Sequence, residues 1–238
     1  MAYLSVKTPL MEKIPVYFMP GLAASSKIFE NIALDAEKYE VVFMEWLLPE
    51  GKESLVSYVK RLADTIIHKN PVLIGVSFGG VIVQEMAKII EARKVIIISS
   101  IKCNTEFPRR MRFARKTHAY RLFPTGLMQN VDRIAKYAFG NNLIAKRLKM
   151  YEKYLSVRDK KYLDWAFKSI LLWDRCEPDA NVVHIHGTSD EVFPSKYVKG
   201  FIPVEGGTHI MIINKFRWMN ENLPLIIEGD MKTGDNRF

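Results

Sequence analysis

The chain has 238 residues, of which 48% are hydrophobic and 26% are charged. These are globular proportions that exclude a collagen-like or disordered chain, and no apolar run reaches the roughly 18 residues of a membrane span. The first residues, MAYLSVKTPLMEKIPV, lack the basic start and unbroken apolar core of a signal peptide, so we expect a cytoplasmic protein. Cys103 and Cys176 form no disulfide framework and no metal-binding spacing, so we expect two free thiols and no metal site.

The net charge of +9 is concentrated in one part of the chain. The segment from Cys103 to Arg175 contains 17 Lys and Arg against 6 Asp and Glu, so it carries +11 and the rest of the chain −2. Such a segment is most often a solvated face, and the alternative is a collar that attracts an anionic substrate or carrier. Nucleic-acid binding is not expected, because no recognisable module is present and the basic segment accounts for the charge.

Short apolar runs alternate with amphipathic stretches over the first hundred residues. This alternation predicts βαβ units, and therefore a parallel sheet with helices on both faces. The predicted strands are 14–19, 39–46, 71–76 and 94–100, and the predicted helices are 25–38, 53–68 and 81–88.

The alternation stops at the basic segment. Residues 103–175 contain no strand-like run, are rich in aromatic residues and are interrupted by Pro108, Pro124 and Gly140, so we predict about four helices inserted into the α/β domain. The α/β pattern then resumes, with predicted strands at 181–187 and 201–204 and predicted helices at 195–199 and 210–222.

Three polar side chains follow three predicted strands. Ser77 follows the third strand, Asp190 follows the strand that ends in His-Gly, and His209 follows the last strand. Because the carboxyl ends of parallel strands lie at one edge of a sheet, these side chains can converge there, where open α/β sheets bind their ligands.

The three residue types also make chemical sense together. A serine hydroxyl becomes a good nucleophile when a histidine takes its proton, and a carboxylate on the far side of the imidazole fixes the tautomer of that histidine. Ser77 lies in Gly75-Val76-Ser77-Phe78-Gly79, where a strained turn from strand to helix leaves no room for side chains at the two glycines. The pattern predicts a G-x-S-x-G nucleophile elbow.

On these motifs the chain resembles the α/β-hydrolase fold superfamily, in particular its lidded serine hydrolases of the carboxylesterase and thioesterase type. The triad order Ser, Asp, His is that of the family. HGTSDEVFP resembles its acid loop, GGTHIM its histidine loop, and MPGLAASSKIF its oxyanion loop, with Pro20 where the family usually has histidine. The resemblance assigns the oxyanion hole to the backbone N–H groups of Leu22 and Phe78.

The resemblance implies one α/β-hydrolase domain with a mostly or wholly parallel sheet of about six strands. Residues 1–102 and 176–238 form the core, and residues 103–175 form the helical lid. The implied reaction is hydrolysis of an ester or thioester of a small-molecule acyl substrate. Ser77 is the nucleophile, His209 the general base and then acid, and Asp190 the residue that orients His209. No metal or organic cofactor is needed.

Plainer interpretations stay open for each of these residues. Ser77 can be a helix N-cap, and Asp190 can cap a turn ahead of Pro194. The competing acids are Glu106 and Glu191. The competing histidines are His68, His118, His184 and His186.

Other functions also stay open. The same triad can serve an acyltransferase, an amidase or a C–C bond hydrolase. A different class is a binding protein without turnover, and a third is a protein whose basic lid docks on an anionic partner. No oligomeric state is predicted.

Overall fold

The computed structural model describes residues 12–118 and 153–229, which contain one six-stranded sheet in the order β2-β1-β3-β4-β5-β6. Every neighbouring pair of strands is parallel. This confirms the predicted parallel sheet of about six strands. The strands are β1 (Ile14–Met19), β2 (Tyr39–Phe43), β3 (Val72–Val76), β4 (Lys94–Ile98), β5 (Val182–Gly187) and β6 (Ile202–Val204).

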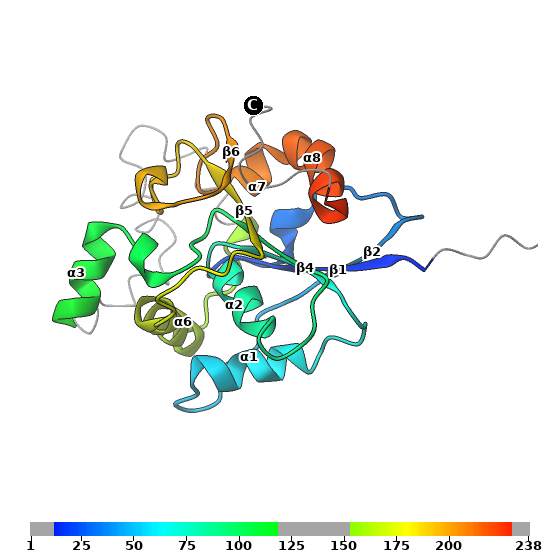
Figure 1. Ribbon diagram of the computed structural model, residues 1–238. Coiled ribbons are helices and arrows are strands. Elements are labelled where there is room, and N and C mark those ends of the chain that lie inside the picture. Colours follow the sequence, from blue (N-terminus) through cyan, green and yellow to red (C-terminus); the bar gives the residue numbers. More distant parts are fainter. Residues whose placement is uncertain (1–11, 119–152, 230–238) are drawn as a thin grey trace, which may run out of the picture.

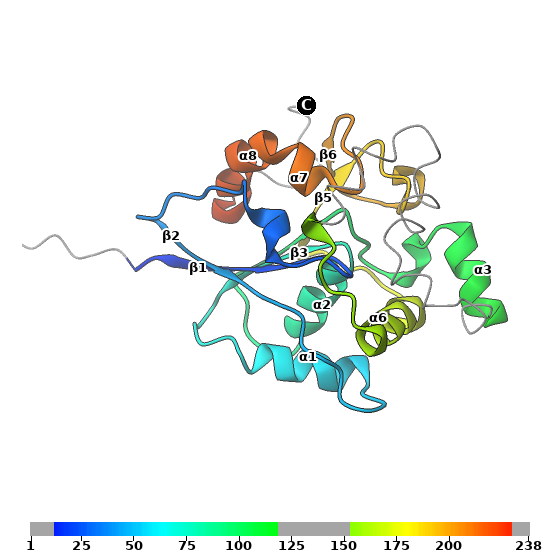
Figure 2. The same cartoon turned by 180° about the vertical axis from the view of Figure 1, so that it is seen from behind.

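Helices cover both faces of the sheet (Figures 1 and 2). One face carries α1 (Leu55–Ala63), α2 (Phe78–Met86) and α6 (Lys160–Leu172). The other carries the 3₁₀ helix η1 (Ser26–Phe29), α7 (Met211–Asn214) and α8 (Phe216–Glu228). The remaining described helices are η2 (Asn104–Glu106), α3 (Arg109–Thr117) and η6 (Ser195–Tyr197). Within residues 12–118 and 153–229, no helix has the length and apolarity needed to cross a bilayer.

Most strand residues are apolar because each face of the sheet has its own core, although the edge strand β2 carries the exposed Glu40 and Phe43. Successive side chains of a strand point to opposite faces. In β1, Tyr17 and Met19 therefore join the core under α1 and α2, while Val16 and Phe18 join the core under α8. Two-sided burial explains why these strands read as continuous apolar runs.

The two ends of the inserted segment lie side by side. The Asn104 N–H donates to the Arg175 carbonyl at 2.8 Å, so the chain leaves and rejoins the core at one place. Helix α6, at the end of the segment, packs on the core, because Tyr162 and Leu163 are buried in the same cluster as α1 and α2. The predicted helices within residues 119–152 lie outside the described residues.

The predicted helix at 25–38 is wrong beyond its first turn, since only η1 forms there. Backbone groups that a helix would use are bonded elsewhere. Ala33 N–H donates to the Asn220 side-chain oxygen of α8, the Asn220 amide donates to the Asn31 carbonyl, and Glu37 N–H donates to the Asp35 carboxylate, each at 2.9 Å. Side chains that bond the backbone compete with helix formation.

Other predicted elements have different bounds. The strand predicted at 39–46 ends at Phe43, and α1 ends at Ala63, after which Ile67 N–H donates to the Tyr17 hydroxyl instead of continuing the helix. The helix predicted at 210–222 is broken at Lys215 into α7 and α8. It then continues through Pro224, because burial of the apolar side chains beyond this proline outweighs the one backbone bond that proline removes.

The two hydrogen bonds of Asn220 predict a measurable contribution to stability. Replacing Asn220 by Ala removes both bonds to the segment between η1 and β2, so we expect the free energy of unfolding in urea to fall by about 1–2 kcal/mol. The control is Glu221→Ala, the exposed neighbour on α8. Equal urea midpoints for the two variants would contradict the prediction.

Candidate active site

The chain passes directly from β3 into α2 through Ser77, which has φ 52° and ψ −118°. This conformation costs a non-glycine residue roughly 1–3 kcal/mol, so the surrounding structure must hold it in place. The Ser77 N–H donates to the Ile98 carbonyl at 2.9 Å, and the Ser100 hydroxyl donates to the Ser77 carbonyl at 2.7 Å. The side chain of Ser77 makes no capping bond to α2, so its hydroxyl is available for another partner.

The two glycines around Ser77 are required by close backbone packing. A Cβ on Gly75 would lie 2.3 Å from the Gly79 carbonyl oxygen, and a Cβ on Gly79 would lie 2.3 Å from the Pro20 carbonyl oxygen. Both distances are impossible for real atoms. The predicted steric reason for glycine at these positions is therefore confirmed, and the same packing brings the loop after β1 against the turn.

The structure brings Ser77, His209 and Asp190 together in a chain of hydrogen bonds. The Asp190 carboxylate lies 2.9 Å from His209 Nδ1, and His209 Nε2 lies 2.9 Å from the Ser77 hydroxyl oxygen. Because an ionised carboxylate can only accept, Nδ1 carries the imidazole proton. The free lone pair on Nε2 then accepts the hydroxyl proton of Ser77. This is the geometry in which a histidine acts as a base toward a serine.

The Asp190 side chain is buried and its charge is balanced on both oxygens. One oxygen faces His209, and the other accepts from the Val192 and Phe193 N–H groups at 2.8 and 2.9 Å. Burial by itself raises the pKa of the Asp190 carboxyl. The charge and hydrogen bond of His209 and the hydrogen bond of the Phe193 N–H lower this pKa by more than burial raises it, so the net pKa lies below its ordinary value. The Phe193 ring also packs edge-on against the His209 ring, with centroids 5.5 Å apart.

Neither competing acid faces His209. The buried Glu106 carboxylate accepts from the Lys102 N–H at 2.6 Å and from the Lys199 N–H at 3.1 Å, so it ties the end of β4 to the loop before β6. Glu191 is exposed. Asp190 is therefore the carboxylate that the fold places on His209.

The other histidines lie elsewhere. The His68 ring is hydrogen-bonded to the Tyr17 hydroxyl, and His118 follows the last turn of α3. His184 and His186 are buried side chains of β5. Of the five histidines, His209 is the one beside Ser77.

The N–H groups assigned to the oxyanion hole border the same site. Phe78 is the first residue of α2, and a Cβ on Gly21, directly before Leu22, would lie 3.4 Å from Ser77 Cβ. Within residues 12–118 and 153–229, neither the Leu22 N–H nor the Phe78 N–H has a hydrogen-bond partner. No described residue therefore competes with an oxygen beside Ser77 for these two donors.

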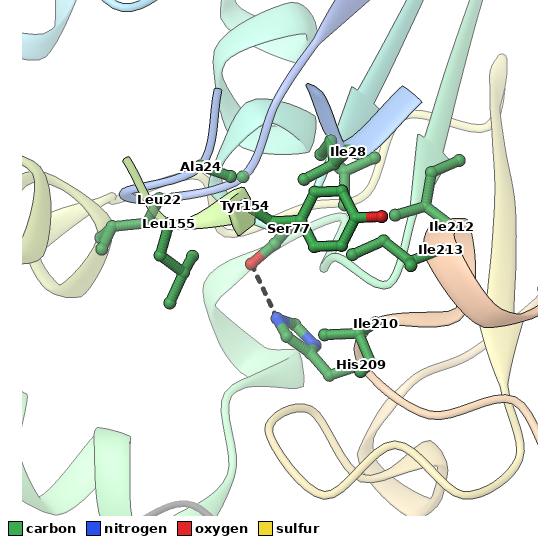
Figure 3. Close-up of a pocket in the computed structure, with 12 residues that line it drawn as sticks. Leu22, Ala24, Ile28, Ser77, Tyr154, Leu155, His209, Ile210, Ile212 and Ile213 are labelled. Atoms are coloured by element: carbon green, nitrogen blue, oxygen red, sulfur yellow. Dashed lines mark hydrogen bonds between the residues drawn. The ribbon is translucent and has the colours of Figure 1, made fainter. Parts of the chain in front are cut away.

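A small apolar cavity of about 90 Å³ opens onto Ser77 and His209 (Figure 3). It has room for several water-sized groups. Tyr154 forms part of its wall, and the Tyr154 hydroxyl donates to the Glu30 carboxylate at 2.5 Å. The remaining side chains around it are almost all aliphatic, namely Leu22, Ala24, Ile28, Val76, Leu155, Ile210, Ile212 and Ile213.

No family model and no curated protein sequence matches this chain. Solved structures do match over most of their length. A bromoperoxidase from Bacillus anthracis has a TM-score of 0.67 at 16% identity, covering 91% of this chain and 92% of that one. An esterase from Thermogutta terrifontis has a TM-score of 0.67 at 12% identity, with coverages of 91% and 90%. An enol-lactonase from Burkholderia xenovorans has a TM-score of 0.67 at 14% identity, with coverages of 91% and 92%.

The chain has the α/β-hydrolase fold. The comparison structures share this fold, and together with the parallel sheet they confirm the predicted α/β-hydrolase fold class, while the helical lid stays a prediction.

In this α/β-hydrolase fold, the residues that support the site are ones the sequence motifs did not identify. The Ser100 hydroxyl donates to the Ser77 carbonyl, and the Phe193 N–H donates to the Asp190 carboxylate. Tyr154 lines the cavity. Phe193 stands inside the acid-loop motif, which was the available signal. Tyr154 lies in the inserted segment, where no sequence pattern distinguishes it from its aromatic neighbours.

No group of His, Cys, Asp or Glu in the described part of the chain is arranged to hold a metal ion. Cys103 is buried and Cys176 is exposed, and both are free thiols.

His184 and His186 form a buried pair behind the acid loop. His186 Nε2 lies 2.8 Å from the Phe193 carbonyl, which can only accept, so this nitrogen carries the proton. His186 Nδ1 then accepts from the Nε2–H of His184 at 3.1 Å. Burial lowers the pKa of both histidines and, for His186, outweighs the raising effects of Asp190 and the Phe193 carbonyl. Both rings are therefore neutral in the folded protein.

The buried histidine pair predicts that the fold loses stability in mild acid. Below the ordinary histidine pKa of 6.5 these two rings bind more protons in the unfolded chain than in the folded protein, so the free energy of unfolding falls as the pH decreases. The slope is at most about 1.4 kcal/mol per pH unit for each histidine. Urea unfolding between pH 7.5 and 5.5 measures it.

His184→Gln is the matched variant for this measurement. A glutamine amide can still donate to His186 but does not titrate, so we expect a smaller slope than in the wild type. Identical slopes for the variant and the wild type would show that His184 titrates normally in the folded protein.

Proposed function

We propose that this protein is a serine hydrolase that cleaves a carboxylic ester or thioester through an acyl-enzyme. The observation that carries the proposal is the hydrogen-bond chain from Asp190 through His209 to the hydroxyl of Ser77, which stands on a strained turn. Beside it lie the Leu22 and Phe78 N–H groups, which have no hydrogen-bond partner among residues 12–118 and 153–229. A serine that served only as a helix cap would need neither the strain nor the imidazole.

In the first half of the proposed reaction, Ser77 Oγ attacks the substrate carbonyl carbon while His209 Nε2 takes the hydroxyl proton. The carbonyl oxygen becomes an oxyanion, which accepts hydrogen bonds from the Leu22 and Phe78 N–H groups. The imidazolium is stabilised by the buried Asp190 carboxylate. His209 then returns the proton to the departing alcohol or thiol, and the acyl group remains on Ser77.

In the second half, a water molecule attacks the acyl-enzyme carbonyl. His209 takes one proton of this water, the same two N–H groups hold the second oxyanion, and the proton is delivered to Ser77 Oγ as the bond to the acyl group breaks. The products are a carboxylic acid and the free enzyme. The protein groups supply every proton transfer, so the proposed reaction needs no cofactor.

The cavity and the charge distribution guide the choice of substrate. The aliphatic wall beside Ser77 fits a short apolar group of the substrate better than a charged one. An anionic or carrier-bound acyl substrate is the further proposal, resting on the basic segment, of which α3 is a described part. None of the residues of α3 is buried, and Arg110 of this helix donates to the Glu191 carbonyl in the acid loop. Rates compared at low and high salt test this attraction.

Two alternatives are an acyltransferase, in which a molecule other than water accepts the acyl group, and a binding protein without turnover. Two of the comparison structures are named as an esterase and an enol-lactonase, which favours hydrolysis over transfer for this chain. A binding protein without turnover has no physical need for the complete hydrogen-bond chain at Ser77.

The first test is release of p-nitrophenol from p-nitrophenyl esters of increasing acyl length. We expect turnover by the wild type and a loss of about 10⁴-fold or more in kcat for Ser77→Ala and His209→Ala. A fluorophosphonate probe should label the wild type and not Ser77→Ala. The control is Ser57→Ala, an exposed serine of α1. Turnover by Ser77→Ala at the wild-type rate would refute the proposed nucleophile.

The cavity wall predicts the size of the preferred substrate. Because the cavity holds about 90 Å³, we expect the highest kcat/KM for esters whose varied acyl or alcohol arm is short. Tyr154→Ala removes an aromatic ring from the wall and should shift the optimum on that arm to longer chains. The control is Tyr197→Ala, a tyrosine of η6 outside the cavity lining. An unchanged length preference in Tyr154→Ala would show that Tyr154 does not limit the pocket.

A further inference from the structure

Trp46 reaches the site from the segment that follows β2. Its indole Nε1–H donates to the Gly21 carbonyl oxygen at 3.0 Å, and its side chain is half-buried. The same carbonyl accepts from the Ala24 N–H at 3.0 Å, which closes a tight turn in the loop after β1. Trp46 therefore bonds a loop that is distant in sequence but borders Ser77.

The Gly21 carbonyl and the Leu22 N–H belong to one peptide unit. This unit is planar and trans, so its C=O and its N–H point in opposite directions. A donor on the carbonyl side fixes the direction in which the N–H points on the other side. It also polarises the peptide, which strengthens the hydrogen bond that this N–H donates.

The ring of Trp46 contacts the residue that carries the second N–H. It is stacked on the Phe78 ring, with centroids 5.3 Å apart and planes 9° apart, and Phe78 is fully buried. The ring of Tyr162 of α6 also packs against the indole, with centroids 5.2 Å apart, and its hydroxyl accepts from the Ala23 N–H at 3.4 Å. One side chain thus touches both halves of the site assigned to the oxyanion.

We propose that Trp46 is a positioning residue that orients and polarises the Gly21–Leu22 peptide and holds Phe78, so that both N–H groups meet the oxyanion. This inference rests on the proposed function, because it assigns Trp46 a role in stabilising the transition state of that reaction. Trp46 does not touch the reacting atoms. It acts through the Leu22 peptide and should therefore affect kcat more than KM.

The test compares two tryptophans of the same aromatic cluster. Trp46→Phe removes the N–H at Gly21. Trp165→Phe is the control, because the Trp165 indole also packs against Phe78 but donates to the Glu53 carbonyl, at 2.9 Å, away from the oxyanion loop. We expect Trp46→Phe to lower kcat by about 5- to 30-fold, less than the 10²–10³ lost with a whole oxyanion donor, with KM changed less than twofold.

A second readout reports the oxyanion directly. A trifluoromethyl ketone matched to the best ester adds to Ser77 and forms a bound oxyanion. Its inhibition constant should weaken in Trp46→Phe by the same factor as kcat/KM, whereas a merely structural role for Trp46 would not couple the two. Where Trp46→Phe fails to fold, benzothienylalanine at position 46 keeps the ring system and its stacking and removes only the N–H.

The outcomes separate this inference from the proposed function. A wild type that hydrolyses no ester and whose Ser77 is not labelled by the fluorophosphonate overturns the proposed function and this inference with it. A wild type that turns over while Trp46→Phe, or the benzothienylalanine protein, matches Trp165→Phe in kcat and in trifluoromethyl ketone binding overturns the role of Trp46 alone. The selective loss described above supports it.

Discussion

The close packing of backbone on backbone at the β3–α2 turn is the constraint on which the site depends. Gly79 must approach Gly75 on one side and the Pro20 carbonyl on the other, at distances that no side chain permits. This packing forces Ser77 into its positive-φ conformation and presses the loop after β1 against the turn. A single steric arrangement thus positions Ser77, the N-terminus of α2 and the loop after β1, and the hydrogen bonds to Ile98 and Ser100 offset the local strain.

The acid side of the site depends on a different interaction, the satisfaction of a buried charge. A carboxylate in the interior is costly unless both oxygens are bonded. Asp190 meets this need with His209 on one oxygen and two N–H groups of its own loop on the other. Because the Phe193 carbonyl in turn accepts from His186, the loop is anchored to the neutral histidines of β5. The sheet therefore helps to orient His209, because His186 of β5 holds the loop whose Asp190 is hydrogen-bonded to His209.

The inserted segment is coupled to both parts of the site. The Ser25 N–H donates to the Tyr154 carbonyl at 3.2 Å, and the Val157 N–H donates to the Ala23 carbonyl at 3.0 Å, so this stretch of the insertion runs along the oxyanion loop. Through Tyr154 it also forms part of the cavity wall. In the proposed reaction, the wall that would select the substrate is therefore bonded to the loop that would stabilise the oxyanion.

Much of this protein follows from sequence patterns whose physical causes are local or periodic. Apolar runs identified the strands, and the predicted parallel sheet placed Ser77, Asp190 and His209 at one edge, where the structure brings them together. The glycines at 75 and 79 pointed to a turn without room for side chains. The helix predicted at 25–38 did not form beyond its first turn because a residue distant in sequence bonds its backbone. Asn220 of α8 takes the backbone groups that a helix at 25–38 would have used.

Only the tertiary structure could decide between the candidate acids and histidines. Glu106, Asp190 and Glu191 are chemically alike in sequence, and the choice of Asp190 depends on which carboxylate the folded loops bring within 2.9 Å of His209. The same holds for Trp46, which is one more apolar residue at the end of a predicted strand until the fold places its indole N–H on the Gly21 carbonyl. The sequence by itself determined the chemistry available and the edge where it gathers, because residue type and periodicity are local properties. The partners of each group were decided by long-range packing, which no local pattern encodes.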